Sequence, residues 1–96
     1  MKPFAIDPNP DAVHLRLNAE VTIEQARALH TALAVALVPA RPLVADFSAL
    51  TRLDAAVLQV LLAAARVASR AQLTAPSPVW TAALKRHGLA NPFVQT

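Results

Sequence analysis

The sequence predicts an α/β fold in which helices pack against a partly parallel sheet. Short apolar segments alternate with longer segments of helical periodicity, in the order strand, strand, helix, strand, helix, strand, helix. Strands that alternate with helices indicate crossover connections and hence parallel neighbours in a sheet. The 96 residues are 55% hydrophobic and 16% charged, which excludes a disordered chain and predicts one domain over residues 1–96.

The first two strands are expected near the N-terminus. Residues 1–11 are rich in proline, so a strand at Phe4–Ile6 should be short and should lie at an edge of the sheet. Apolar and polar residues alternate over Val13–Leu17, which predicts a half-buried strand with its polar side chains facing outward. Asn18 is expected to turn the chain, because asparagine tolerates a left-handed backbone.

The first helix is predicted from Thr22 to about Val38. Thr22 is followed three positions later by Gln25, which is a capping-box pattern, and Pro39 is expected to end the helix. Its core face is expected to carry Ile23, Ala26, Leu29, Leu33 and Leu37. After Pro42, the mostly apolar residues 43–47 predict a buried strand, and residues 48–51 are expected to form a connection.

The second helix is the strongest signal in the sequence. Residues 53–70 contain no glycine or proline and are dominated by alanine and leucine, with Asp54 or Thr51 placed to cap the N-terminus. The face expected to meet the sheet carries Leu58, Leu61, Leu62 and Ala65. A flanking apolar stripe carries Val57, Val60, Ala64 and Val67, and we expect it either to be buried by neighbouring helices or to form a protein-binding surface.

The last third of the chain predicts a short strand at residues 72–75 and a third helix. Ser77 is expected to cap this helix and Pro78 to occupy its first turn, while Gly88 follows its C-terminal end. Residues 89–96 are expected to form a tail, in which Phe93 is available to clamp onto the core.

The sequence offers little catalytic chemistry. It contains no cysteine and one glycine, and its three histidines lack metal-ligand spacing, so no catalytic, cofactor or metal site is predicted. Asp46 and Asp54 could form an acidic pair across a loop, although a capping role for Asp54 is favoured. The net charge of +3 comes from dispersed basic residues with few aromatics, which disfavours a nucleic-acid partner.

Three stretches of the sequence resemble the STAS domain family, named for sulphate transporters and anti-sigma-factor antagonists. They are LRLNAEVTIEQARAL, LVADFSALTRLDAAVLQVLLAAARVA and PSPVWTAALKRHGL, within a resemblance that extends from about residue 12 to residue 93. The second stretch is the most specific. The likeness is greatest to small bacterial members, including those encoded with chemotaxis systems and the small subunits of lipid-trafficking ABC transporters.

The resemblance implies a four- to five-stranded mixed sheet with three main helices, and a binding module instead of an enzyme. Regulated members of the family are phosphorylated on a serine or threonine at the start of the second helix, by a partner kinase that doubles as an anti-sigma factor. Here that position falls on Ala56, which has no hydroxyl. Thr51 and Ser48 are the nearest hydroxyls before it, and Asn18 stands where the family usually has a turn glycine.

The expected function is a non-catalytic protein–protein interaction module in signalling or chemotaxis-associated regulation, without a phosphorylation switch at Ala56. The partner would dock on the N-terminal half of the second helix and on the loop before it, with a polar rim around small and apolar side chains. The partner-binding residues are expected to be Arg52, Asp54, Ala55, Ala56, Val57, Gln59, Val60 and Ala63.

The expected partner is an anti-sigma-type kinase or a chemotaxis component, and the cytoplasm is the expected location because no leader or membrane-spanning segment is visible. In the main alternative, the chain is an accessory subunit that stabilises the ATPase of an ABC transporter. A homodimer is left open as well. The alternative of another class is a weak nucleic-acid-binding domain that would use Arg66, Arg70, Lys85 and Arg86.

Overall fold

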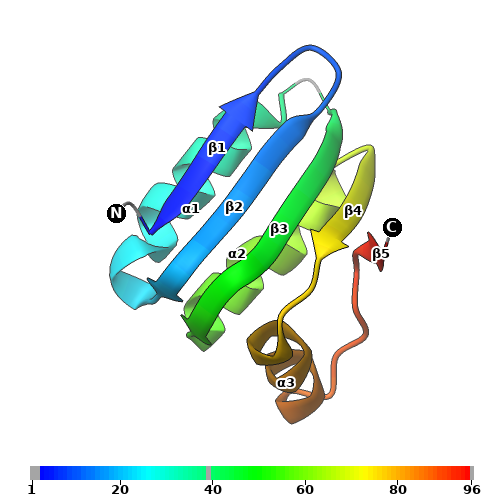
Figure 1. The fold of residues 1–96 in the computed structure, drawn as a ribbon. Helices are drawn as coiled ribbons and strands as arrows, with labels where there is room; N and C mark the ends of the chain where they lie inside the picture. The colour runs from blue at the N-terminus through cyan, green and yellow to red at the C-terminus, as the bar shows by residue number, and fades with distance from the viewer. Residues whose placement is uncertain (1–2, 39, 96) are drawn as a thin grey trace.

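The computed structural model describes residues 3–38 and 40–95, and within these ranges five strands form one mixed sheet (Figure 1). The strands lie in the order β1-β2-β3-β4-β5; β1 is antiparallel to β2, and the other neighbours are parallel. The predicted α/β class, with a mixed sheet and three helices, is confirmed. The elements are β1 (Phe4–Pro8), β2 (Val13–Val21), α1 (Ile23–Ala36), β3 (Pro42–Leu53), α2 (Ala55–Val67), β4 (Arg70–Ala75), α3 (Pro78–Arg86) and β5 (Val94–Gln95).

Helices α1 and α2 lie side by side on one face of the sheet, while α3 lies beyond the C-terminal ends of β3 and β4 (Figure 1). The alternating residues of β2 explain this layering, because Val13, Leu15 and Leu17 are buried toward the helices. His14 and Arg16 are exposed, as predicted, on the opposite face. No helix in the described part of the chain is both long and apolar enough to cross a membrane.

Strand β1 pairs with β2 at the edge of the sheet, where the prolines of the N-terminal segment predicted a short strand. The turn between them is held by Asn9, whose Oδ1 accepts the backbone N–H groups of Asp11 at 3.1 Å and Ala12 at 3.0 Å. This side-chain acceptor imitates a backbone carbonyl, so the hairpin closes without glycine.

Strand β3 is longer than predicted and contains residues 48–51, which the sequence suggested as a connection. Pairing with β2 continues to the end of both strands, from Asn18 beside Ala49 to Val21 beside Leu53. Register shifts after Arg16 and Ala19 make this possible, because a bulge lets the twisted strands stay paired where the apolar alternation fails.

The left-handed backbone before α1 occurs at Ala19, with φ of 49°, and not at Asn18 as predicted. The sequence argument placed the turn at the residue that tolerates this conformation best. The bulge instead imposes it on the next residue, where the register of β2 against β3 shifts. A non-glycine residue in this region is strained by about 1–2 kcal/mol.

Helix α1 begins as the capping-box pattern predicts, since the Gln25 side chain accepts the backbone N–H of Thr22 at 2.9 Å. It ends at Ala36, ahead of Pro39, which lies outside the described residues. The prediction of Ile23 as a core residue is wrong: its side chain is 68% exposed. Ile23 is the first residue of the helix, and the buried face of α1 begins one turn later, at Ala26.

The buried face of α2 is rotated from the predicted one. The buried residues are Val57, Leu58, Leu61 and Ala64, whereas Leu62 and Ala65 are only half-buried. Half of the flanking stripe therefore belongs to the core, because α1 packs against that side of α2. Helix α2 also runs from Ala55 to Val67, which is shorter than the predicted range of 53–70.

Helix α3 has the predicted ends. Ser77 Oγ accepts the N–H of Val79 at 3.1 Å, Pro78 opens the helix, and Gly88 follows it with φ of 64°. The predicted clamp is also present, since Phe93 is buried with its ring 5.6 Å from that of Trp80. Within the predicted tail, residues 94–95 add strand β5 beside β4.

Candidate functional site

The N-termini of α1 and α2 are joined at one end of the sheet by Asp54. This residue precedes α2, but its Oδ2 accepts the N–H of Ile23, the first residue of α1, at 3.0 Å. Helices leave their first N–H groups without intrahelical partners, and a carboxylate there also complements the helix dipole. Asp54 therefore fixes the two helices relative to each other where the candidate surface begins.

Most of the predicted docking residues lie together at the surface along the N-terminal half of α2. Arg52, Ala55, Gln59 and Ala63 are exposed. Asp54, Ala56 and Val60 are half-buried. Ala55, Gln59 and Ala63 are spaced four residues apart on one side of α2, whereas Arg52 lies near the end of β3 and not in a loop as predicted.

Val57 does not belong to this surface. Its side chain is completely buried and belongs to the hydrophobic core. The expectation that Val57 supplies apolar area to a partner is therefore wrong. The error arose because the apolar arc of α2 is wider than one core face, and the sequence alone does not show where α1 packs against it.

The structure adds a second wall to the candidate surface, which the sequence did not indicate. Two adjoining depressions of about 490 and 280 Å³ lie between the start of α2 and α3. Both are lined by Leu53, Asp54, Ala83 and Arg86. No local pattern predicts this, because it depends on how α3 packs at the end of the sheet.

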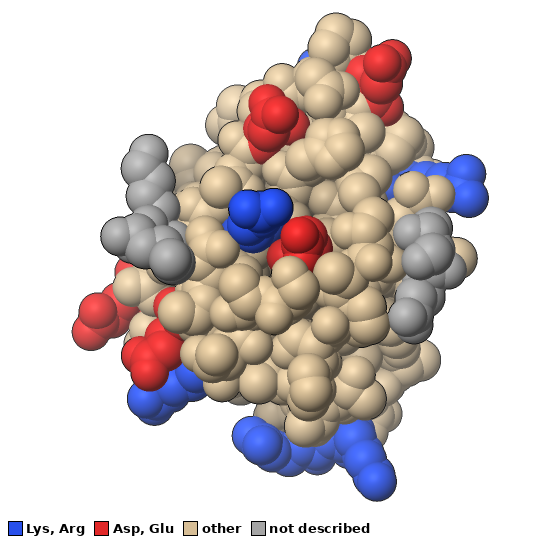
Figure 2. All heavy atoms as spheres, in the orientation of Figure 1, with Lys and Arg blue, Asp and Glu red and all other residues tan. Residues whose placement is uncertain are grey.

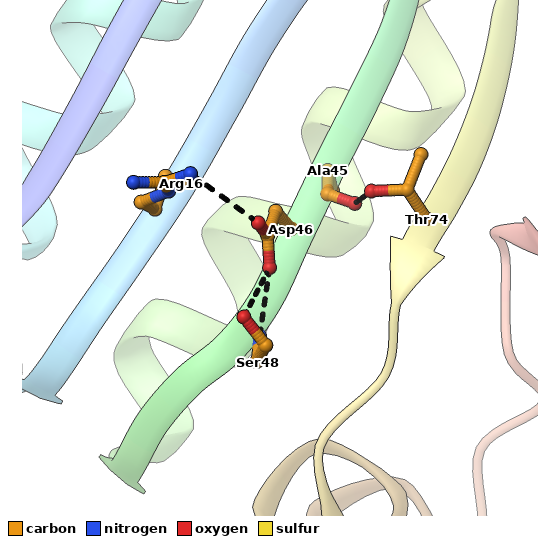
Figure 3. Close-up of polar contacts among 5 residues, drawn as sticks. All are labelled: Arg16, Ala45, Asp46, Ser48 and Thr74. Atoms are coloured by element: carbon orange, nitrogen blue, oxygen red, sulfur yellow. Dashed lines mark hydrogen bonds and ion pairs between the residues drawn. The ribbon is translucent and has the colours of Figure 1, made fainter.

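The two nearby hydroxyls have different surroundings. Thr51 is exposed and lines the larger depression beside Arg52. Ser48 lies on the open face of the sheet, where its Oγ donates to Asp46 Oδ1 at 2.7 Å and its N–H donates to the same oxygen at 2.9 Å (Figure 3). Of the two, only Thr51 borders the candidate docking surface.

Asp46 belongs to a small polar cluster in the middle of the open face. Hydrogen bonds from Ser48 lower the pKa of the Asp46 carboxyl, and the Arg16 guanidinium 3.7 Å away lowers it further (Figure 3). Figure 2 shows an acidic and a basic side chain together near the centre of this face, surrounded by uncharged ones. Asp46 and Asp54 do not form an acidic pair, because the seven residues of β3 from Phe47 to Leu53 extend between them.

The basic residues considered for nucleic-acid binding do not form one patch. Arg86 lines the depression beside Asp54 at the start of α2, whereas Arg66 lies in the last turn of α2 and Arg70 begins β4. At 1.5 Å per residue, the length of α2 separates the two groups by roughly 18 Å. This arrangement lacks the continuous basic stripe expected of a nucleic-acid interface.

Comparison with known proteins identifies the fold and the family. The family model described as "Mlab, STAS domain" matches residues 4–95. A search of curated proteins finds no match. Among solved structures, the unphosphorylated anti-sigma factor antagonist SpoIIAA has 17% identity over 97% of this chain and 86% of its own, with a TM-score of 0.76.

Two further structures agree with this result. The phosphorylated form of SpoIIAA, a Bacillus cell fate determinant, has 19% identity over 97% of this chain and 90% of its own, with a TM-score of 0.76. An anti-sigma factor antagonist from Mycobacterium paratuberculosis has 20% identity over 96% of this chain and 82% of its own, with a TM-score of 0.77. At these identities the structures establish the fold, whereas the family model covers nearly all of the sequence. The chain therefore belongs to the STAS domain family.

Proposed function

We propose that this protein is a non-catalytic interaction module of bacterial signalling that works in the cytoplasm and binds a protein partner through the start of α2. The supporting observation is that the small side chains of Ala55 and Ala63 are exposed on one side of α2, beside the half-buried Ala56 and Val60. Alanine lets a partner backbone approach closely and loses no side-chain entropy on binding. We name this the α2 docking surface, formed by Arg52, Asp54, Ala55, Ala56, Gln59, Val60 and Ala63.

The depressions against α3 make the α2 docking surface partly concave. Arg52 and Gln59 are exposed, and Arg86 borders both depressions. Protein interfaces place polar and arginine side chains around a desolvated centre in this way. A partner that inserts an apolar side chain between α2 and α3 would cover the half-buried Leu53 and the exposed Ala82.

The α2 docking surface works without the phosphorylation switch of regulated STAS domains, because Ala56 has no hydroxyl to modify. A phosphate would add about −1.5 to −2 charges beside Asp54 and repel an acidic partner. Without it, binding depends on the concentration and state of the partner. The favoured partners are an anti-sigma-type kinase or a chemotaxis component.

A second candidate partner is the ATPase of an ABC transporter, which the chain would stabilise as an accessory subunit. The sequence stretches that resemble the small subunits of lipid-trafficking transporters favour it. Both candidates use the α2 docking surface, so they differ in the partner and not in the residues on this chain.

The test is to substitute Ala55 by glutamate. The negative charge lies in the first turn of α2, where the helix dipole favours it, so the fold is retained. The charge lies in the centre of the α2 docking surface and should weaken binding at least about tenfold, or 1.4 kcal/mol. The partner is captured from the native host with tagged protein, identified by mass spectrometry, purified, and titrated against both variants by calorimetry.

The matched control is Ala28→Glu, which places the same charge on an exposed alanine of α1. It should bind the partner as the unmodified protein does. If Ala55→Glu also binds every purified partner with unchanged affinity, the assignment of the α2 docking surface is wrong. The identity of the partner decides between signalling and transport.

A further inference from the structure

Two exposed arginines line the larger depression between the start of α2 and α3. Arg52 lies near the end of β3, and Arg86 lies in the last turn of α3, at the end of the molecule where Figure 2 shows basic side chains. Within residues 3–38 and 40–95 neither guanidinium forms an ion pair, although Glu20 of β2 is the cross-strand neighbour of Arg52. Unpaired positive charges beside one hollow attract a negatively charged group.

Asp54 is the one acidic residue that lines the two depressions, and its charge is already used. Its Oδ2 accepts the N–H of Ile23 at 3.0 Å, and the carboxylate lies between two helix N-termini, whose dipoles are positive there. Helix α2 has no acidic residue in its first turn, and His87 beside the smaller depression adds no negative charge. The rim of the depressions is therefore positive.

The surface next to the arginines is apolar. In the larger depression Leu53 and Val79 are half-buried, whereas Pro78 and Ala82 are exposed. Its volume of about 490 Å³ lies within the range of sites that hold small ligands or single large side chains. A carboxylate held by the arginines would thus stand beside a surface that a large apolar side chain can cover.

Contacts between α3 and β3 hold Arg86 in place relative to Arg52. Ser77, which caps α3, is buried, and its Oγ donates to the backbone carbonyl of Leu50 in β3 at 3.2 Å. Trp80, one turn into the helix, is completely buried in the core. Because the two arginines stand on elements that already contact each other, a partner loses little free energy in ordering them.

We propose that the larger depression binds an acidic segment of the partner, in which an aspartate or glutamate lies next to a large apolar side chain. The carboxylate contacts Arg52 and Arg86, and the apolar side chain covers Leu53 and Ala82. This inference rests on the proposed function, because the depression is the α3 side of the α2 docking surface, and it adds the chemistry of the partner.

The probe is a phage-displayed library of random linear peptides, selected on the immobilised full chain. Selected peptides should be enriched in aspartate or glutamate beside leucine, phenylalanine or tryptophan. A selection that yields no binder, or binders without an acidic excess over the unselected library, overturns the proposal. The most enriched peptide is then synthesised with a fluorescent label and titrated by anisotropy. Arg52→Glu and Arg86→Glu should each raise its dissociation constant about tenfold, because attraction becomes repulsion.

The matched control is Arg66→Glu, which makes the same change of charge in the last turn of α2 and lines neither depression. It should leave the dissociation constant within about twofold of the unmodified value. Equal weakening by all three variants would show that the peptide responds only to net charge, and would overturn the proposal. Trp80 fluorescence verifies folding. If Arg86→Glu does not fold, Arg86→Gln replaces it and should weaken binding about threefold.

A change of charge on the peptide tests the direct contact. A peptide with lysine in place of its acidic residue should bind Arg86→Glu more tightly than it binds the unmodified protein, because the pair is restored in reverse. Equal binding to both proteins contradicts the contact. Self-association of the unmodified protein in sedimentation velocity, abolished by Arg86→Glu, would identify a second copy of this chain as the occupant and would also overturn the proposal.

The captured and purified partner separates this inference from the proposed function. Ala63→Arg changes the α2 docking surface at an exposed position that lines neither depression, so it should weaken the partner and leave the peptide unaffected. If Ala63→Arg weakens the partner but the Arg52 and Arg86 variants do not, the α2 docking surface stands and the acidic segment is wrong. The reverse result supports the acidic segment and contradicts the surface along α2.

Discussion

The carboxylate of Asp54 accepts the backbone N–H of Ile23 at 3.0 Å, although the two residues are 31 positions apart. Asp54 stands at the cap position of α2, yet its side chain satisfies a donor of α1. Asp54 therefore contributes to two helix N-termini. Its backbone occupies the N-cap position of α2, and its side chain accepts the first N–H of α1.

Asp54→Ala should destabilise the fold by about 1–2 kcal/mol, because it leaves a helix N–H of α1 without its acceptor and removes a favourable charge at two helix N-termini. Urea denaturation followed by the fluorescence of Trp80 measures this loss. Asp54→Asn retains an acceptor oxygen and should lose less. Equal stability of Asp54→Ala and the unmodified protein would show that the bond contributes nothing in solution.

Ala19→Gly should stabilise the protein by about 1 kcal/mol, since glycine adopts the left-handed backbone at this position without a Cβ penalty. Thermal denaturation should show a higher midpoint. The contrasting control is Ala28→Gly in the exposed face of α1, where glycine should cost about 1 kcal/mol. A lower midpoint for Ala19→Gly would mean that the strain is relieved by the neighbouring bulge.

Phe93→Ala should destabilise the fold by about 3–5 kcal/mol, because it removes a buried ring from the cluster with Phe47 and Trp80. Chemical denaturation is the measurement. Phe4→Ala at the half-buried edge strand provides the comparison and should cost less. Equal losses for the two variants would contradict a role for Phe93 as the clamp of β5.

Ser48→Ala should raise the pKa of Asp46 toward its ordinary value, since the Ser48 hydroxyl is the largest cause of its lowering. Arg16→Gln should raise the pKa less, because Arg16 is the smaller cause. Carboxyl titration by NMR measures both, with Ser69→Ala as a control at an exposed serine. A larger rise in the Asp46 pKa from Arg16→Gln than from Ser48→Ala would contradict this ranking of the two causes.

The same bonds give the stability of the fold a defined dependence on pH. The folded pKa of Asp46 lies below its unfolded value of about 3.9, so its contribution is complete above that pH and is lost as the pH falls through the folded pKa. Ser48→Ala should therefore be less stable than the unmodified protein at neutral pH, and this difference should narrow below about pH 4. A difference that stays constant with pH would contradict the linkage.

The sequence predicted the ends of α3 and the start of α1 well, because residues within a few positions of each end determine them. Ser77, Pro78 and Gly88 fix the ends of α3 through contacts within a few residues, and Gln25 does the same for α1. The alternation over Val13–Leu17 likewise identified the buried side of β2. These features depend on backbone geometry that neighbouring residues determine.

The errors concern residues whose state depends on distant partners. Val57 is buried because α1 packs beside α2, and β3 continues past Ser48 because β2 supplies a partner strand through two register shifts. The wall that Arg86 adds to the α2 docking surface depends on where α3 packs. No periodicity within a single segment contains this information.

The strands occupy the sheet in the same order as they occur in the chain (Figure 1). During synthesis, each new strand can therefore add to an edge that already exists, and a finished sheet never has to open for a later strand. The same order has a cost for a nascent chain, because until the next strand emerges, β2, β3 or β4 in turn presents unpaired N–H and C=O groups. Slow translation between these strands would prolong the exposure of an edge strand, which could then pair with a second nascent chain on a neighbouring ribosome.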